Sequence, residues 1–226
     1  MKSAQVPEEV KSGHWFFELL TRLAPKPEEV VVTGTPEEMI AEAAQKAFWI
    51  STSLGAVPGP LGLATILPEI SAVTKIQIGL VHKIAKYHHQ LETLNHPILL
   101  LVFANALGLA VGNQLVRRVG VRLVVRALSA PIIERIARAI GLEIAAKITQ
   151  RIAGRWVVLI AAPLLGYFSR KMTQKIGREA QRLFAGVIEI EPVRRCLQGH
   201  EVAGDTKFCP DCGAKIPAAA GGIYDL

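Results

Sequence analysis

The sequence GAVPGPLGLATILPE, residues 55–69, connects the first two long helices that the residue pattern predicts. All of it except the final Glu69 belongs to a run without charged residues, Ala47 to Pro68, that has the length of a bilayer span. Pro58 and Pro60 interrupt this run, because a proline inside a helix removes a backbone hydrogen bond and clashes with the turn before it. We therefore expect a tight apolar elbow that lets the two helices pack side by side. Its residues are Pro58, Gly59, Pro60, Pro68 and Glu69.

Proline and glutamate mark the start of each helix beside the elbow. Thr35-Pro36-Glu37-Glu38 has the pattern of a capping box and predicts a helix over 36–54. Pro68 and Glu69, followed by apolar residues at helical spacing, predict a second helix over 69–91. Further helices are predicted near 7–22, 98–112, 113–128, 131–152 and 155–184. The expected fold class is therefore an all-α helical bundle.

The composition favours a large buried core, contact with a bilayer, or both. The chain has 226 residues, of which 50% are hydrophobic and only 20% charged, and its mean hydropathy is +0.32. The charge-free runs Thr93–Val116 and Trp156–Ser169 are interrupted by polar residues or proline, so neither is a clean membrane span. The N-terminus also lacks the apolar segment of a signal peptide. We expect a cytoplasmic protein, peripheral at the inner face of the membrane, with integral insertion as the alternative.

Positive charge is concentrated in the central part of the chain. The net charge is +7, and residues 61–190 hold seventeen Lys and Arg against six Asp and Glu. Arginines spaced four apart would lie along one helix face, which is typical of contact with anionic lipid. Phosphates of a nucleic acid and a merely solvated surface are the alternatives, although few aromatic residues accompany the basic ones. The predicted contacts with an anionic membrane surface or a membrane protein are Arg118, Arg122, Arg126, Arg135 and Arg138.

The clearest chemical motif is CLQGHEVAGDTKFCPDCGAKI near the C-terminus. Cys209 and Cys212, followed by Gly213, form a knuckle whose turn aims both sulfurs at one metal ion. Cys196 and His200 supply the second half, and the motif resembles a zinc ribbon. Gly199 stands where that family usually has a cysteine, so the set departs from the family pattern and has His200 as its fourth ligand. We predict a closed structural zinc site and, for so small a module, folding that depends on the metal.

No pattern in the chain indicates catalysis. The sequence has no phosphate-binding glycine loop and no Ser, His and Asp in the order of a catalytic triad. It also lacks a Glu base at the spacing of a catalytic zinc motif. His82, His88, His89 and His96 cluster near a helix end, where a polar terminus explains them better than a metal site. Gln77 is expected to form a hydrogen bond in the core. An enzyme built around a helical cavity is the remaining alternative, and a metabolite that copurifies would indicate it.

The segment GAVPGPLGLATILPEISAVTKIQIGLVHKIAKYHH resembles the core of the EcsC family of bacterial proteins. The shared features are the Gly/Pro turn, the pair Pro68-Glu69, Gln77, and the ending Ile84-Ala85-Lys86-Tyr87. The later stretch AAPLLGYFSRKMTQKIGREAQRLF is similar to the last helices of that family, with Gly166, Thr173, Gly177 and Ala180 in place. The resemblance covers residues 36–185 and implies an α-helical, membrane-associated protein without established enzymatic activity.

The predicted organisation follows from these segments. Residues 1–35 form an N-terminal helix and linker, 36–185 the helical domain, 186–195 a linker, 196–217 the zinc ribbon and 218–226 a tail. We expect a non-enzymatic accessory or scaffold protein whose apolar hairpin and basic helices engage lipid or a membrane partner. The ribbon would dock a protein. A nucleic-acid-associated zinc-ribbon protein is the alternative.

Overall fold

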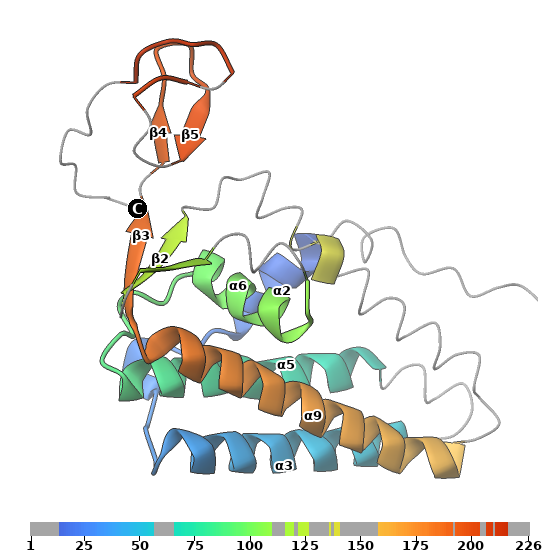
Figure 1. Cartoon of the computed structure of the whole chain (residues 1–226). Coiled ribbons are helices and arrows are strands. Elements are labelled where there is room, and N and C mark those ends of the chain that lie inside the picture. Colours follow the sequence, from blue (N-terminus) through green and yellow to red (C-terminus); the bar gives the residue numbers. More distant parts are fainter. Residues whose placement is uncertain are drawn as a thin grey trace, which may run out of the picture.

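The helices α3 (Pro36–Gly55), α5 (Ile66–Tyr87) and α9 (Val158–Phe184) lie side by side at the base of the molecule (Figure 1). α3 runs antiparallel to α9, as two contacts show: Ser51 with Ser169 at one end, and Glu37 with Gln181 at the other.

The structure is a computed structural model. It describes residues 14–56, 66–109, 116–119, 122–126, 136, 138–140, 158–191, 193–203, 207–209 and 211–216.

The predicted capping box is confirmed at the start of α3. The Glu38 N–H donates to Thr35 Oγ1 at 3.3 Å, and the Thr35 N–H donates to Glu38 Oε2 at 2.9 Å. Two backbone donors that the helix itself leaves unpaired are thereby satisfied. The helix that contains Pro68 and Glu69 is confirmed too, although it begins two residues before Pro68, at Ile66.

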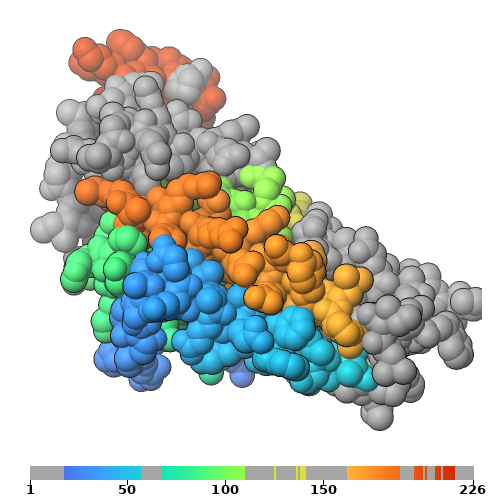
Figure 2. All heavy atoms as spheres, turned by 60° about the horizontal axis from the view of Figure 1, so that its bottom comes forward, coloured from blue at the N-terminus to red at the C-terminus, as the bar shows by residue number. Residues whose placement is uncertain are grey.

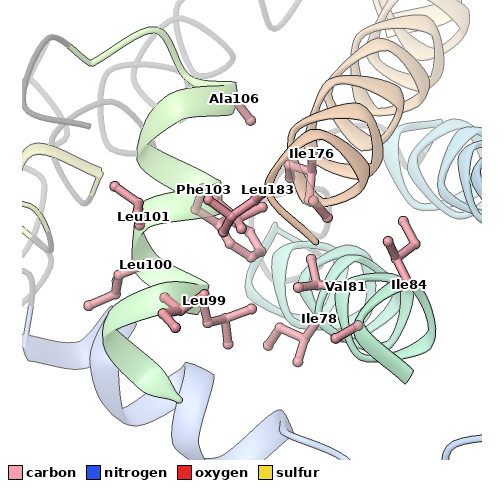
Figure 3. Packing of buried hydrophobic residues seen from close by; sticks show 14 of the residues in the cluster. Ile78, Val81, Ile84, Leu99, Leu100, Leu101, Phe103, Ala106, Ile176 and Leu183 are labelled. Carbon is pink, nitrogen blue, oxygen red and sulfur yellow. The ribbon is translucent and has the colours of Figure 1, made fainter. Parts of the chain in front are cut away.

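The main core lies between α5, α9 and the shorter helix α6 (His96–Ala106), as Figure 3 shows. In α6, residues 98–104 are all at most 4% exposed, because apolar side chains surround the helix and neighbouring elements cover it on every side. Phe103 of α6 meets Leu183 and Ile176 of α9 in the centre of the cluster. The helix α2 (His14–Leu23) adds the fully buried Leu20, and a 3₁₀ turn, η1 (Pro27–Glu29), precedes α3.

Polar bonds connect the long helices within this apolar surrounding. The hydroxyls of Ser51 and Ser169 share a hydrogen bond of 2.6 Å between α3 and α9. Gln77 Nε2 donates to Thr173 Oγ1 at 3.1 Å, between α5 and α9, which confirms Gln77 as a hydrogen-bonding group of the core. Gln90, just after α5, donates to the carbonyl oxygens of Phe184 and Gly186, so it holds the end of α9 in place.

The helix predicted over 113–128 is wrong, since the described residues of this segment, 116–119 and 122–126, form strands. β1 (Val116–Val119) pairs antiparallel with β2 (Arg122–Arg126), and β2 pairs parallel with β3 (Val187–Glu191), which follows α9. The body is therefore mostly helical but not all-α. The reason is the high content of valine, whose branched side chain packs well on a pleated surface. Val125 of β2 and Ile188 of β3 are buried against the core.

The segment predicted as a linker, 186–195, also contains strands. β3 is followed by β4 (Val193–Arg195), which pairs antiparallel with β5 (Glu201–Ala203). This two-stranded sheet carries the C-terminal turns and lies beyond β3, away from the long helices (Figure 1). The division of the chain into separate modules stays a prediction.

Some predicted features fall outside the described residues. These are Pro58, Gly59 and Pro60 of the elbow, Arg135, and most of the helix over 131–152. Pro68 is exposed in the first turn of α5, and Glu69 beside it is only 3% exposed. Among the helices that the structure describes, none combines the length and the apolar character that a bilayer crossing requires.

Candidate metal centre

The first half of the site is a turn that begins at Cys196, directly after β4. The Gly199 N–H donates to the Cys196 carbonyl oxygen at 2.9 Å, and the Cys196 N–H donates to the His200 carbonyl oxygen at 3.0 Å. Gly199 has a φ of +84°, in the left-handed region that glycine enters without steric cost. A zinc ribbon usually has cysteine at the position of Gly199. Here this glycine adopts the conformation that the turn requires, and His200 after it offers a ring nitrogen as ligand atom.

The second half repeats this backbone pattern around Cys209. The Gly213 N–H donates to the Cys209 carbonyl oxygen at 2.8 Å, and the Cys209 N–H donates to the Ala214 carbonyl oxygen at 2.8 Å. Gly213 has a φ of +69°, which confirms the left-handed conformation expected from its place after Cys212. Each half therefore closes its turn with a glycine that directly precedes or follows a ligand.

Together the turns bring four metal-ligand atoms to one point. The Sγ atoms of Cys196, Cys209 and Cys212 and a ring nitrogen of His200 all lie within 4.8 Å of one another. The Cys196 Sγ is 3.7 Å from the Cys212 Sγ and 3.6 Å from His200 Nδ1, and the Cys209 Sγ is 3.8 Å from the same nitrogen. A disulfide requires sulfurs about 2.05 Å apart, and all three cysteines are free. This group could hold a metal ion.

The surroundings of the thiols shift their pKa values in opposite directions. Burial raises the pKa of Cys196, but hydrogen bonds from the backbone N–H groups of Gln198 and His200 and from the neighbouring thiols outweigh it and lower the pKa to about 7. For Cys212, the Ala214 N–H lowers the pKa, while burial and the sulfurs of Cys209 and Cys196 outweigh it and raise the value. Cys196, which ionises readily, thus lies beside Cys212, which resists ionisation, and a bound cation would favour the thiolate form of both.

The apolar core of this module is very small. Beside Cys196 and Cys209, its buried members are Val202 and Ile216, and they are separate from the main core. Two aliphatic side chains bury too little apolar surface to offset the conformational entropy of ordering the module. The four ligands therefore occupy the position that a hydrophobic core would fill in a larger domain.

The arginines predicted to contact an anionic partner are not aligned on one helix. Arg118 lies on β1, opposite Leu123, whereas Arg122 and Arg126 lie on β2. In the parallel ladder, Arg126 stands opposite Glu191. Arg138 is exposed in a helical segment, and Arg135 lies outside the described residues. The helical stripe expected from the spacing is therefore not formed, while contact of these arginines with an anionic partner stays a prediction.

An exposed apolar group on α3 and α9 was not predicted from the sequence. Trp49 is 58% exposed, Leu164 67%, Tyr167 52% and Phe168 43%. Part of this exposed group could have been predicted from the stretch 158–184. Its apolar residues at 164, 167 and 168 fall on the same helix face as lysines and arginines further along, which indicates a face that water reaches.

The histidines near the end of α5 form no metal site with the residues around them. In the part of the chain that the structure describes, the four C-terminal side chains form the group with metal-ligand geometry. His82 Nδ1 is instead 2.8 Å from the Ile78 carbonyl oxygen, and burial lowers the pKa of His82. Burial also lowers the pKa of His88, against the opposing effect of the Glu37 carboxylate.

The fold and the metal centre were compared with known proteins in three ways. No protein-family model, no curated protein and no solved structure matches this chain.

Proposed function

We propose that Cys196, His200, Cys209 and Cys212 bind one structural zinc ion. A tetrahedral zinc site has Zn–S distances of about 2.3 Å and Zn–N distances of about 2.05 Å, which place its ligand atoms roughly 3.5–3.8 Å apart. The separations of 3.6, 3.7 and 3.8 Å fit this geometry. Three thiolates and one imidazole are also a donor set that zinc prefers. Because four protein ligands complete the shell, no position is open for a substrate, and the role of the ion is structural.

The wider function that we propose is that of a non-enzymatic accessory or scaffold protein. The zinc module would present a docking surface for a protein partner, and the helical body would attach to a membrane surface. The ligand cluster carries the first half of this proposal, because a metal-dependent fold of about twenty residues has too little volume for an active site. The resemblance to the EcsC family and the excess of cations in residues 61–190 support the second half.

Metal analysis of the purified full-length protein tests the zinc site. We expect about one zinc per chain, with Cys209→Ser and His200→Asn each lowering the bound zinc after dialysis against a chelator. Asp211→Asn is the matched control, because Asp211 lies between two ligands and is exposed but is outside the cluster. Its zinc content should equal that of the wild type.

The results can contradict the proposal in distinct ways. A protein that folds with no metal, or one that retains iron in place of zinc, would overturn the assignment of the ion. Loss of zinc in Cys209→Ser but full retention in His200→Asn would remove His200 from the ligand set and leave a three-cysteine site. Equal loss in Asp211→Asn would show that general destabilisation of the module, and not ligand removal, lowers the zinc content.

A further inference from the structure

Large apolar side chains are exposed on two of the long helices. They are Trp49 of α3 and Leu164, Tyr167 and Phe168 of α9, each 43–67% exposed. We call these four residues the aromatic end. Water contact with so many large apolar groups is unfavourable. A concentration of such side chains on one surface commonly marks a place where another molecule binds.

The packing of α3 against α9 brings together the two helix segments that carry the aromatic end. Gly55 of α3 lies beside Leu165, and the backbone of Phe48 lies beside Gly166. The Ser51–Ser169 hydrogen bond fixes the same register. The ring of Phe48 in turn stacks edge-on against Trp49, with centroids 5.3 Å apart. The C-terminal half of α3 and the N-terminal half of α9 are therefore neighbours, and Figure 2 shows both on one face of the molecule.

Positive charge continues from the aromatic end along the exposed side of α9. The spacing of four, three and four residues places these cations on one helix face. Glu179 is the one acid within α9, and its carboxylate pairs with Arg182 at 2.8 Å. Lys171 Nζ lies over the ring of Tyr167, 5.5 Å from its centroid, so the charged and apolar parts of the surface adjoin. We call this set the basic stripe: Lys171, Lys175, Arg178 and Arg182.

We propose that the aromatic end and the basic stripe form the surface through which the helical body binds an anionic bilayer. Trp and Tyr side chains are favoured at the boundary between headgroups and acyl chains, where their rings are buried and their polar atoms stay hydrated. Lysines beside them reach anionic headgroups while their aliphatic chains cover apolar surface. This proposal rests on the membrane half of the proposed function. It assigns the contact with the bilayer to α3 and α9 in place of the arginines of β1 and β2.

Flotation of the full-length protein with vesicles tests this surface. Vesicles of phosphatidylcholine alone are compared with vesicles that also contain phosphatidylglycerol. The wild type should float with the anionic vesicles and much less with the neutral ones. Lys171→Gln and Lys175→Gln should each lower binding to anionic vesicles by about fivefold. The double variant Leu164→Ser, Tyr167→Ser should abolish flotation, with an unchanged far-UV circular dichroism spectrum.

Matched controls lie elsewhere on the molecule. Tyr87→Ser removes an aromatic ring that is 42% exposed at the far end of α5, and Lys207→Gln removes an exposed charge on the metal module. Both variants should float as the wild type does. A variant that retains Trp49 as its single tryptophan is made by Trp15→Phe and Trp156→Phe. Its tryptophan fluorescence emission should shift to shorter wavelength on addition of anionic vesicles.

The outcomes separate this inference from the proposed function. A wild type that floats with neither vesicle overturns both. Flotation that the Leu164, Tyr167, Lys171 and Lys175 variants leave intact overturns the surface but keeps membrane attachment. An equal loss of flotation in the Tyr87→Ser or Lys207→Gln control also overturns the assignment of binding to this surface. Binding of the basic stripe to duplex DNA, with a steep salt dependence and without flotation, would assign the stripe to nucleic acid.

Discussion

His89 ends α5 in a conformation that side chains disfavour. Its φ is +56°, and it is the residue other than glycine with positive φ in the described part of the chain. The Gln90 N–H donates to the Ala85 carbonyl oxygen at 2.8 Å and the His89 N–H to the Lys86 carbonyl oxygen at 3.0 Å, which is the Schellman arrangement. Glycine usually occupies this position, because a Cβ there crowds the following carbonyl group.

We predict that His89→Gly raises the free energy of unfolding by about 1 kcal/mol, since it removes this crowding. The matched control adds a side chain to a glycine in the same position of another helix. Gly108 follows α6 with a φ of +76° and the same pair of backbone bonds, and nothing lies within 4 Å of a Cβ built there. Gly108→Ala should therefore destabilise by about 1 kcal/mol. Chemical denaturation measures both, and a less stable His89→Gly would show that the imidazole makes contacts worth more than the strain.

The sequence was a good guide to residues whose role is local. The capping pair Thr35 and Glu38 was predicted because its bonds join residues three apart. The ligands Cys209 and Cys212 were predicted for the same reason. His89 carries no such signal, because the need for a left-handed residue there depends on where α5 ends, and tertiary contacts set that point.

At the scale of elements, β1 and β2 show how periodicity can mislead. Arg118, Arg122 and Arg126 are four residues apart, which fits a helix face but is also a multiple of the two-residue period of a strand. The valines of this segment and the pair Gly120-Val121 between two valine-rich runs were the stronger signal, because a two-residue connection that begins with glycine is typical of a hairpin. In the antiparallel register, Val119 at the end of β1 pairs with Arg122 at the start of β2.

The close approach of α3 and α9 depends on a glycine that the helix pattern does not explain. A Cβ at Gly166 would lie 2.8 Å from the Phe48 carbonyl oxygen and would overlap Thr52 Oγ1. The carbonyl belongs to the backbone of α3, so the helix as a whole would have to move. Gly166 is a residue of the EcsC resemblance, and helix packing gives a physical reason for a small residue at this position.

We predict that Gly166→Ala destabilises the protein by about 1–3 kcal/mol through overpacking. Gly79→Ala is the matched control, because Gly79 is also inside a helix, α5, but has nothing within 4 Å of an added Cβ. There the change should stabilise by about 0.5–1 kcal/mol, since alanine is the better helix former. Thermal unfolding followed by circular dichroism compares the two. Equal effects at both positions would show that helix propensity and not the α3–α9 contact decides the result.

At the scale of the whole molecule, long-range contacts account for what could not be predicted. The parallel pairing of β2 with β3 joins residues about sixty positions apart, on either side of α9, and no local pattern announces it. The exposure of Trp49 beside α9 likewise follows from the α3–α9 register, which Ser51 and Ser169 fix across the fold. The cluster of three cysteines and His200 was the exception, because each half of it is encoded in a short turn.

The described residues form two cores that share no buried residue. The larger joins the helices with Val125 and Ile188 of the sheet, and the smaller consists of Cys196, Val202, Cys209 and Ile216. The first is held mainly by apolar burial, with polar bonds such as Ser51–Ser169 and Gln77–Thr173 between its helices. The second has so little of it that the proposed zinc ion must supply most of the folding free energy.

We therefore predict that removal of zinc unfolds the metal module and leaves the helical body intact. A strong chelator should expose residues 196–216 to rapid proteolysis, while the helical circular dichroism signal and the melting temperature of the body stay unchanged. Added zinc should restore protection, by the mass action of a ligand that binds only the folded state. A fall in the melting temperature of the helices on chelation would mean that β3 and β4 transmit folding between the two cores, which then unfold as one cooperative unit.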